Sequence, residues 1–279
     1  MTGSRRRAGE DPREIERFDQ LAREWWDPAG PMAPLHRLNP VRLAYIRDQV
    51  CRHLGRDPRR IRPFAGLEVL DVGCGAGLLA EPLARLGATV TGIDPASDPL
   101  EVGRRRAEAA GLEIDYRNAG IEDLAGAERR FDLVAALEVV EHVPDPARFI
   151  AACVSLVRPG GALVLATLNR TIRSFALGIV AAEYLLGWLP RGTHQWGRFL
   201  RPSELARPLR RAGAQVVDVT GVVYDPLRDR FRLSGDVAVN YLLFATMPPV
   251  TEPRRPGPDS RAASRTRVQA AQQASRMSA

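Results

Sequence analysis

A glycine-rich segment between two apolar runs contains the residues of this chain best suited to hold a ligand. Asp71 is followed at alternate positions by Gly73, Gly75 and Gly77, and Asp94 ends the next apolar run. Glycines leave the backbone bare at a strand-to-helix turn, so a ligand can approach the main chain closely. A carboxylate at the tip of the following strand can accept hydrogen bonds from ribose hydroxyls. These residues predict a nucleoside-type cofactor site in an α/β sheet.

The spacing of the glycines distinguishes between two classes of cofactor. A dinucleotide-binding loop reads G-x-G-x-x-G and holds a pyrophosphate, whereas this loop reads G-x-G-x-G and Asp71 stands just ahead of it. A carboxylate there would repel a pyrophosphate and attract a ligand that carries an ammonium and a sulfonium group. The loop resembles motif I of the class I S-adenosylmethionine (SAM) methyltransferases. The resemblance implies SAM as the cofactor and disfavours the alternative, an NAD-type oxidoreductase.

Length and composition favour one α/β domain with two tails. The chain has 279 residues, of which 45% are apolar, and its net charge is +7. All 40 of its Lys and Arg residues are arginines. Cys51, Cys74 and Cys153 are scattered, which argues for a reduced compartment and against a disulfide framework. No apolar stretch follows the first basic residues, so we expect a cytoplasmic protein without a secretory signal. No RNA-binding aromatic motif or zinc finger accompanies the charge, so no nucleic-acid partner is expected.

The pattern between the tails predicts a parallel sheet. Residues 1–13 and 249–279 are polar and basic, which predicts disorder, and residues 14–248 form the expected domain. Apolar strands alternate with helices there, which is typical of a Rossmann-like sheet with helices on both faces. We expect seven strands, mostly parallel, with an antiparallel edge strand. The expected strands are 68–72, 89–94, 112–117, 131–137, 162–167, 215–223 and 237–247. The expected helices are 76–86, 99–110, 146–157 and 202–212, and a turn is expected at 158–161. Ligands bind such sheets at the carboxyl ends of the strands.

Further segments narrow the family. Phe131–Val134 and Leu156–Gly161 resemble methyltransferase motifs II and III. More specific segments are Trp25–Pro28, Pro34–Leu43, Thr167–Thr171, Ala182–Tyr184, Pro190–His194 and Val239–Tyr241. In this order they resemble the ubiquinone-biosynthesis O-methyltransferases over residues 14–247. The resemblance implies methylation of a ring hydroxyl on a lipophilic polyprenyl phenol, and a complex with other proteins of quinone biosynthesis.

The resemblance also assigns residues to the cofactor. Those carried over are Arg42, Gly73, Asp94, Leu137, Ile121 and Glu122. Arg42 would pair with the methionine carboxylate, because its planar guanidinium can donate two parallel hydrogen bonds. Asp94 would hold the ribose, and Leu137 would present its backbone near the methionyl end. Ile121 and Glu122 would flank the adenine. The pattern alone leaves alternatives open. Arg42 fits a surface cation, Asp94 a helix cap, and Leu137 a core residue.

An acidic cluster follows the strand that ends at Leu137. A helical turn there would bring Glu138 close to Glu141 and His142. A phenol has a pKa near ~10, so it needs either a general base or a metal that lowers its pKa. The resembled family is associated with Mg²⁺ at these three residues, and His142 is alternatively the base. The other interpretation is that they cap the following turn and helix.

The most apolar segment, Ser174–Leu189, lies where this fold inserts a substrate lid, which we expect over residues 169–201. It is too short to span a bilayer, which needs ~20 apolar residues. With arginines on both sides, it fits an interfacial helix at the inner face of the cell membrane. The alternative is a lid helix packed on the core.

Overall fold

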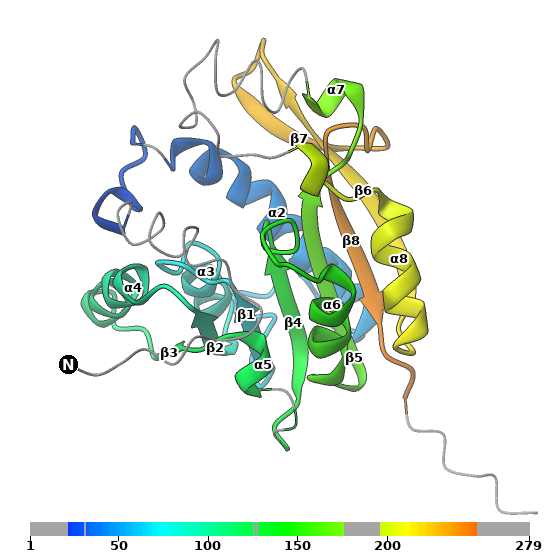
Figure 1. Ribbon diagram of the computed structural model, residues 1–279. Helices are drawn as coiled ribbons and strands as arrows, with labels where there is room; N and C mark the ends of the chain where they lie inside the picture. The colour runs from blue at the N-terminus through cyan, green and yellow to red at the C-terminus, as the bar shows by residue number, and fades with distance from the viewer. Residues whose placement is uncertain (1–21, 31, 125, 127, 176–195, 250–279) are drawn as a thin grey trace, which may run out of the picture. The chain divides into compact units, whose positions relative to one another are not determined.

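The computed structural model describes residues 22–30, 32–124, 126, 128–175 and 196–249 (Figure 1). The chain divides into two units, Met1–Pro248 and Pro249–Ala279, and every helix and strand below belongs to the first. Both expected tails, apart from Pro249, and most of the apolar segment at 174–189 lie outside the described residues. No helix among the described residues is both long enough and apolar enough to cross a membrane.

The described strands form one mixed sheet in the order β3-β2-β1-β4-β5-β8-β6-β7. The strands are β1 (Glu68–Val72), β2 (Thr89–Asp94), β3 (Ile114–Asn118), β4 (Phe131–Leu137), β5 (Val157–Leu168), β6 (Gln215–Asp225), β7 (Arg230–Ser234) and β8 (Asn240–Thr246). The first five in the spatial order run parallel, and β8 is antiparallel to both β5 and β6. The predicted fold class is therefore confirmed. The predicted strand count was one too low, because β7 forms an additional edge hairpin with β6, and antiparallel β8 lies inside the sheet.

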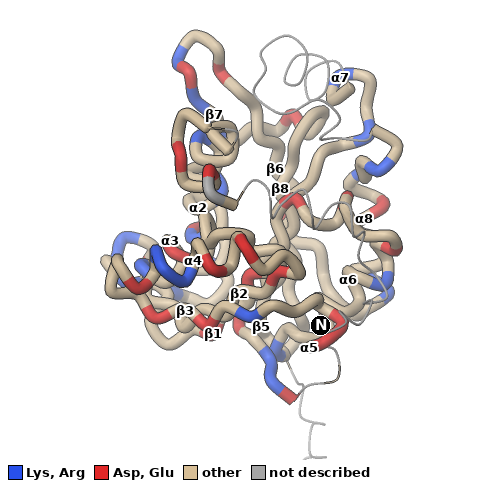
Figure 2. Tube along the Cα trace, turned by 60° about the vertical axis from the view of Figure 1, so that its left-hand side comes forward, with Lys and Arg blue, Asp and Glu red and all other residues tan. Residues whose placement is uncertain are grey.

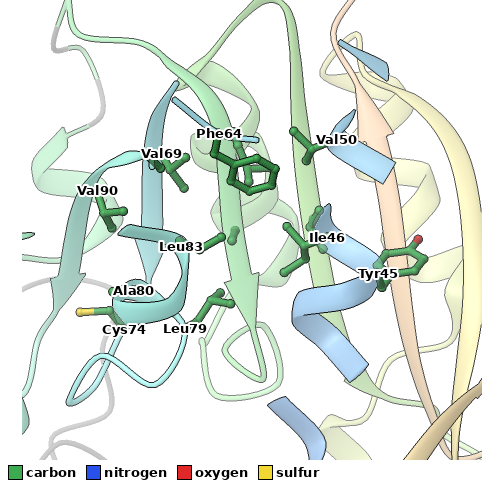
Figure 3. Close-up of a cluster of buried hydrophobic side chains, with 14 of the residues drawn as sticks. Tyr45, Ile46, Val50, Phe64, Val69, Cys74, Leu79, Ala80, Leu83 and Val90 are labelled. Atoms are coloured by element: carbon green, nitrogen blue, oxygen red, sulfur yellow. The ribbon is translucent and has the colours of Figure 1, made fainter. Parts of the chain in front are cut away.

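Helices cover both faces of this sheet. They are η1 (Ala22–Glu24), α2 (Ala33–His53), α3 (Ala80–Arg85), α4 (Ser97–Ala109), α5 (Ile121–Leu124), α6 (Pro146–Ser155), α7 (Ile172–Ser174), η3 (Trp196–Arg198) and α8 (Pro202–Arg211). Helices α2, α3 and α4 share one apolar core with one side of the strands (Figure 3). Helices α5, α6 and α8 share the core on the other side. Successive strand residues such as Val69 and Leu70 point into different cores, which explains the nearly continuous apolar runs.

Local signals set several element boundaries. Helix α6 begins where Asp145 accepts hydrogen bonds from the backbone N–H groups of Ala147 and Arg148, each at 3.0 Å, with Pro146 in the first turn. Helix α3 begins four residues later than predicted, because the glycine-rich loop continues beyond Gly77. The expected turn at 158–161 is instead an irregularity inside β5, where the register with β4 shifts.

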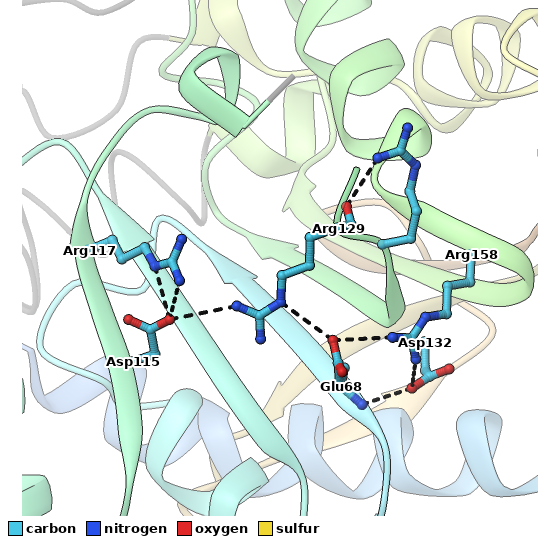
Figure 4. Close-up of polar contacts among 7 residues, drawn as sticks. Glu68, Asp115, Arg117, Arg129, Asp132 and Arg158 are labelled. Carbon is cyan, nitrogen blue, oxygen red and sulfur yellow. Dashed lines mark hydrogen bonds and ion pairs between the residues drawn. The ribbon is translucent and has the colours of Figure 1, made fainter. Parts of the chain in front are cut away.

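Basic and acidic positions alternate along the described backbone (Figure 2), and one group of these residues joins the amino-terminal halves of four strands (Figure 4). The Asp132 carboxylate accepts hydrogen bonds from the Glu68 backbone N–H at 2.8 Å and from Arg158 at 2.7 Å. Arg129 lies 3.4 Å from Glu68 and 3.7 Å from Asp115. These contacts connect β3, β1, β4 and β5 at the edge of the sheet opposite to their carboxyl ends.

We expect Asp132→Ala to lower the free energy of unfolding by about 1 to 3 kcal/mol, because it leaves the Glu68 N–H without its acceptor and removes one of the two carboxylates that pair with Arg158. Arg117→Ala, which removes an ion pair between side chains that are both nearly half exposed, should change it by less than ~1 kcal/mol. Urea unfolding of both variants measures the difference. Equal losses would mean that Asp132 contributes no more than a surface charge.

Candidate active site

The chain leaves β1 through a bend, residues 73–77, whose backbone only glycine adopts easily. The three glycines of this glycine bend have φ values of 69°, 51° and 86° in chain order. A Cβ atom on them would overlap Val139, Trp25 and Tyr116, respectively. The bend is therefore packed by side chains from other parts of the chain, and each glycine is needed for conformation and for space.

Two carboxyl groups lie beside the glycine bend. Asp94, at the end of β2, accepts hydrogen bonds from the Gly75 N–H at 2.8 Å and the Ala96 N–H at 2.9 Å. It therefore fixes the bend and also orders the chain before α4. Asp71 is 3% exposed, and burial, then the charge of Asp94, raises its pKa to about 8. Its Oδ2 atom is buried without a hydrogen-bond partner.

Arg42 lies on α2 and is 4% exposed, so the surface-cation interpretation is wrong. Its Nη2 donates a short hydrogen bond to the Glu138 carboxylate, which also accepts one from the Asn240 side-chain amide at 2.9 Å. Burial lowers the Arg42 pKa, and the charges of Glu138 and Glu141 oppose that shift. The guanidinium nevertheless keeps one buried donor, Nε, without an acceptor.

The residues predicted to bind Mg²⁺ lie in and just before a turn that follows β4, where both carboxyl groups contact other side chains. Glu138 has a left-handed backbone, with φ of 57°, and faces Arg42 and Asn240. Glu141 accepts a hydrogen bond from the Thr167 hydroxyl at 2.9 Å, and burial, then the charge of Glu138, raises its pKa well above the usual range. His142 follows in a turn closed by its N–H on the Val139 carbonyl at 2.9 Å, not in a helix. The described residues contain no group of three or more His, Cys, Asp or Glu that could hold a metal ion.

The remaining predicted residues lie at the same carboxyl edge of the sheet. Leu137 ends β4 and is partly buried against the core, and Ile121 and Glu122 begin α5, just beyond the end of β3. The Ile121 side chain is buried in the core on the α6 face, so Ile121 can meet a ligand only through its backbone. The Glu122 side chain is half-buried.

The unpartnered polar atoms fit the predicted cofactor. Arg42 Nε is a cationic donor that lacks an acceptor, and Asp71 Oδ2 is a carboxyl oxygen that lacks a donor. Buried polar atoms without partners are rare in native proteins and call for an explanation such as a ligand. The methionine part of SAM carries one carboxylate and one ammonium, which are complementary to these two atoms.

Sequence reasoning missed two parts of this site. Asn240, at the first position of β8, supports Glu138, and the tryptophans at 25 and 26 contact the glycine bend. Both lie in segments that resemble the family, Val239–Tyr241 and Trp25–Pro28, to which no role was assigned. A polar side chain at the start of an otherwise apolar strand was the available signal for Asn240.

Comparison with known proteins supports a methyltransferase. A family model described as a methyltransferase domain matches residues 42–219. A protein of Methylobacterium sp. (strain 4-46), named ubiquinone biosynthesis O-methyltransferase, is 58% identical over 85% of this chain and 96% of its own length. A protein of Azorhizobium caulinodans with the same name is 52% identical over 84% and 92%.

Solved structures share the fold. Magnesium protoporphyrin IX methyltransferase (ChlM) from Synechocystis PCC 6803 with bound SAM superimposes with a TM-score of 0.55 at 19% identity, covering 87% of this chain and 100% of that one. A SAM-dependent methyltransferase from Aquifex aeolicus gives a TM-score of 0.52 at 16% identity, covering 85% and 98%.

The raised pKa of Asp71 predicts a pH-dependent stability in the absence of ligand. Its folded pKa of about 8 lies above the unfolded value of ~3.9, so the folded state alone holds this proton between those values. The contribution of the protonated Asp71 carboxyl to the free energy of unfolding is fully present below pH ~4 and is lost as the pH rises toward 8. Relative to Asp71→Asn, which never ionises, the wild type should lose about 1.4 kcal/mol per pH unit between pH ~5 and ~7, and less per unit as the pH reaches 8. Denaturant unfolding at pH 5 to 8 measures this, and parallel curves would contradict it.

Proposed function

The chain belongs to the family of ubiquinone biosynthesis O-methyltransferases, and from this premise we propose that it methylates a ring hydroxyl of a polyprenyl phenol. It is a SAM-dependent O-methyltransferase of ubiquinone biosynthesis. The observation that carries the assignment of its site is the glycine bend, with the buried carboxyl of Asp71 and the carboxylate of Asp94 beside it.

In this proposal the chain binds SAM mainly through charge. Arg42 Nε donates to the methionine carboxylate, and the unpartnered Oδ2 of Asp71 accepts a hydrogen bond from the ammonium group. Asp94 accepts hydrogen bonds from the ribose hydroxyls, because it ends β2 beside the glycine bend and a carboxylate offers about four acceptor sites. The glycine bend lets the ligand approach the backbone, Leu137 presents its backbone near the methionyl end, and Ile121 and Glu122 flank the adenine.

SAM supplies a methyl group on sulfonium sulfur, which passes to the phenolic oxygen while the C–S electron pair stays on sulfur. The chain has to align that oxygen and remove its proton, since a phenol with a pKa near ~10 is a poor nucleophile at neutral pH. We assign His142 as the base that takes the proton. Glu138 contacts Arg42 and Asn240, and Glu141 accepts from Thr167 through one of its two oxygens; no step is assigned to Mg²⁺.

The proposal extends to a membrane surface beside the site. Ile172 and Phe175, which begin the expected lid, are 84% and 47% exposed. Arg173 stands between them and pairs with Asp236 at 2.9 Å. Exposed apolar side chains beside arginines favour contact with anionic lipid, where a polyprenyl substrate and other proteins of its pathway would be found. The rest of the lid, residues 176–195, lies outside the described residues.

The test of the function uses the full chain with methyl-labelled SAM and a polyprenyl catechol. We expect label in the ring methyl ether, and calorimetric binding of SAM but not of NAD. Methylation of unrelated small molecules with no turnover of the catechol would replace the proposed substrate. Absence of SAM binding would reject the site.

Asp94→Ala should weaken SAM binding about 5- to 150-fold, the equivalent of ~1 to 3 kcal/mol, because the ribose and the Gly75 N–H both lose an acceptor. Calorimetric titration with SAM measures the affinity. Asp115→Ala is the matched control, because it removes a carboxylate from the neighbouring strand β3 that pairs only with surface arginines. An unchanged affinity for Asp94→Ala would refute the ribose assignment.

The membrane surface predicts that the full chain co-sediments with vesicles that contain anionic phospholipid. The double variant Ile172→Glu and Phe175→Glu should lose most of this binding, because each change puts a carboxylate in contact with an anionic, apolar surface. Ile61→Glu is the control, since Ile61 is 92% exposed in the loop between α2 and β1. Equal binding by all three proteins would contradict this surface.

A further inference from the structure

Two adjacent tryptophans from the amino-terminal part of the chain contact the glycine bend. Trp25 is 7% exposed and packs with Met32 and Ala76, and its ring fills the space beside Gly75. The Trp26 indole N–H donates to the Ala76 carbonyl at 2.9 Å. This tryptophan pair, Trp25–Trp26, is 50 residues from the bend in sequence and belongs to a segment to which no role has been assigned above.

Helix α2 holds the residues after the bend in the same way. The Asn39 side-chain amide donates to the Leu78 carbonyl at 2.5 Å. Asn39 lies three residues before Arg42, so both face the same side of α2. The imidazole of His36, on the same helix, hydrogen-bonds the Trp25 carbonyl at 3.0 Å. These hydrogen bonds thus link the glycine bend to the tryptophan pair and to the helix that carries Arg42.

The position of Trp26 is fixed by residues of three helices. The Arg106 guanidinium, from α4, lies 3.6 Å from the centre of the Trp26 ring, which is the geometry of a cation–π contact. Arg106 is itself held by Glu81 of α3 at 2.9 Å. On α2, the His36 ring meets the Trp26 ring edge-on at 5.8 Å between centroids.

A glycine-rich bend has the most conformational freedom to lose when it binds a ligand, and that loss subtracts from affinity unless the bend is ordered beforehand. The hydrogen bonds from Trp26 to the Ala76 carbonyl and from Asn39 to the Leu78 carbonyl, just beyond the bend, order it from the protein itself. We propose that Trp26 and Asn39 are positioning residues for the cofactor, which hold the glycine bend in its SAM-binding conformation. The inference rests on the proposed role of the bend in SAM binding.

The test is Trp26→Phe in the full chain, which removes the indole N–H and keeps an aromatic ring for Arg106. We expect the Kd and the KM for SAM to rise about fivefold, the effect of one neutral hydrogen bond. The kcat at saturating SAM and the KM for the phenol should not change, because the ordered bend is the same once SAM is bound. A general loss of structure would lower kcat and alter both KM values.

Trp196→Phe is the matched control for SAM affinity. Its indole N–H donates to the Thr171 carbonyl at 2.9 Å, so the substitution deletes the same kind of bond away from the bend. Asn39→Ala provides the second variant if Trp26→Phe does not fold, and it should raise the Kd for SAM to a similar extent. Unchanged SAM affinity in the folded variant, or an equal rise in Trp196→Phe, would overturn the inference. Absence of SAM binding by the wild type would instead overturn the proposed function.

Discussion

The bend between β1 and α3 is the constraint on which the rest of the site depends. Its three glycines adopt left-handed backbone conformations, and Val139, Trp25 and Tyr116 occupy the space that side chains would need. These three come from the segment after β4, the amino-terminal segment and β3. A substitution at each of these glycines would therefore disturb a different distant part of the chain. The bend also brings its Gly75 N–H to Asp94 at the end of β2, so the loop and the predicted ribose acceptor are fixed as one unit.

The buried ion pair of Arg42 and Glu138 organises the other half of the site. Removing a guanidinium from water is costly unless a carboxylate and further hydrogen bonds compensate for it, and Glu138 supplies that carboxylate from a strained backbone position. Asn240 supports the same carboxylate. Because the Glu138 carboxylate compensates the buried charge of Arg42 through Nη2, the Nε donor of Arg42 remains for a second anion. The pairing explains how one arginine can be held in place without ligand and still bind a cofactor carboxylate.

Sequence reasoning located the elements whose signals are local. The bounds of β1, β2 and β4 match the predicted ones, because parallel strands buried on both faces are mostly apolar runs. Strand β7 was missed, since Arg-Phe-Arg-Leu-Ser is short, half polar and paired on one side only. The sequence spacing predicted that Asp71 and Asp94 lie beside the glycine bend, but it did not predict the partner of Arg42. Arg42 and Glu138 are 96 residues apart, and only the packing of α2 against the ends of β4 and β8 brings them together.

Strand β5 connects the proposed reaction site to the proposed lipid surface. Thr167, near its end, binds Glu141. The next residues are anchored to the segment before β8, where Asn169 donates to Val237 at 2.9 Å and Thr171 to Ala238 at 2.6 Å. Ile172, the first exposed apolar residue, is only five positions beyond Thr167, a span of at most ~18 Å even in an extended chain. That is close to half the ~30 Å thickness of a bilayer core. A substrate bound in the proposed way could therefore present its ring to the site while most of its tail stays in the lipid.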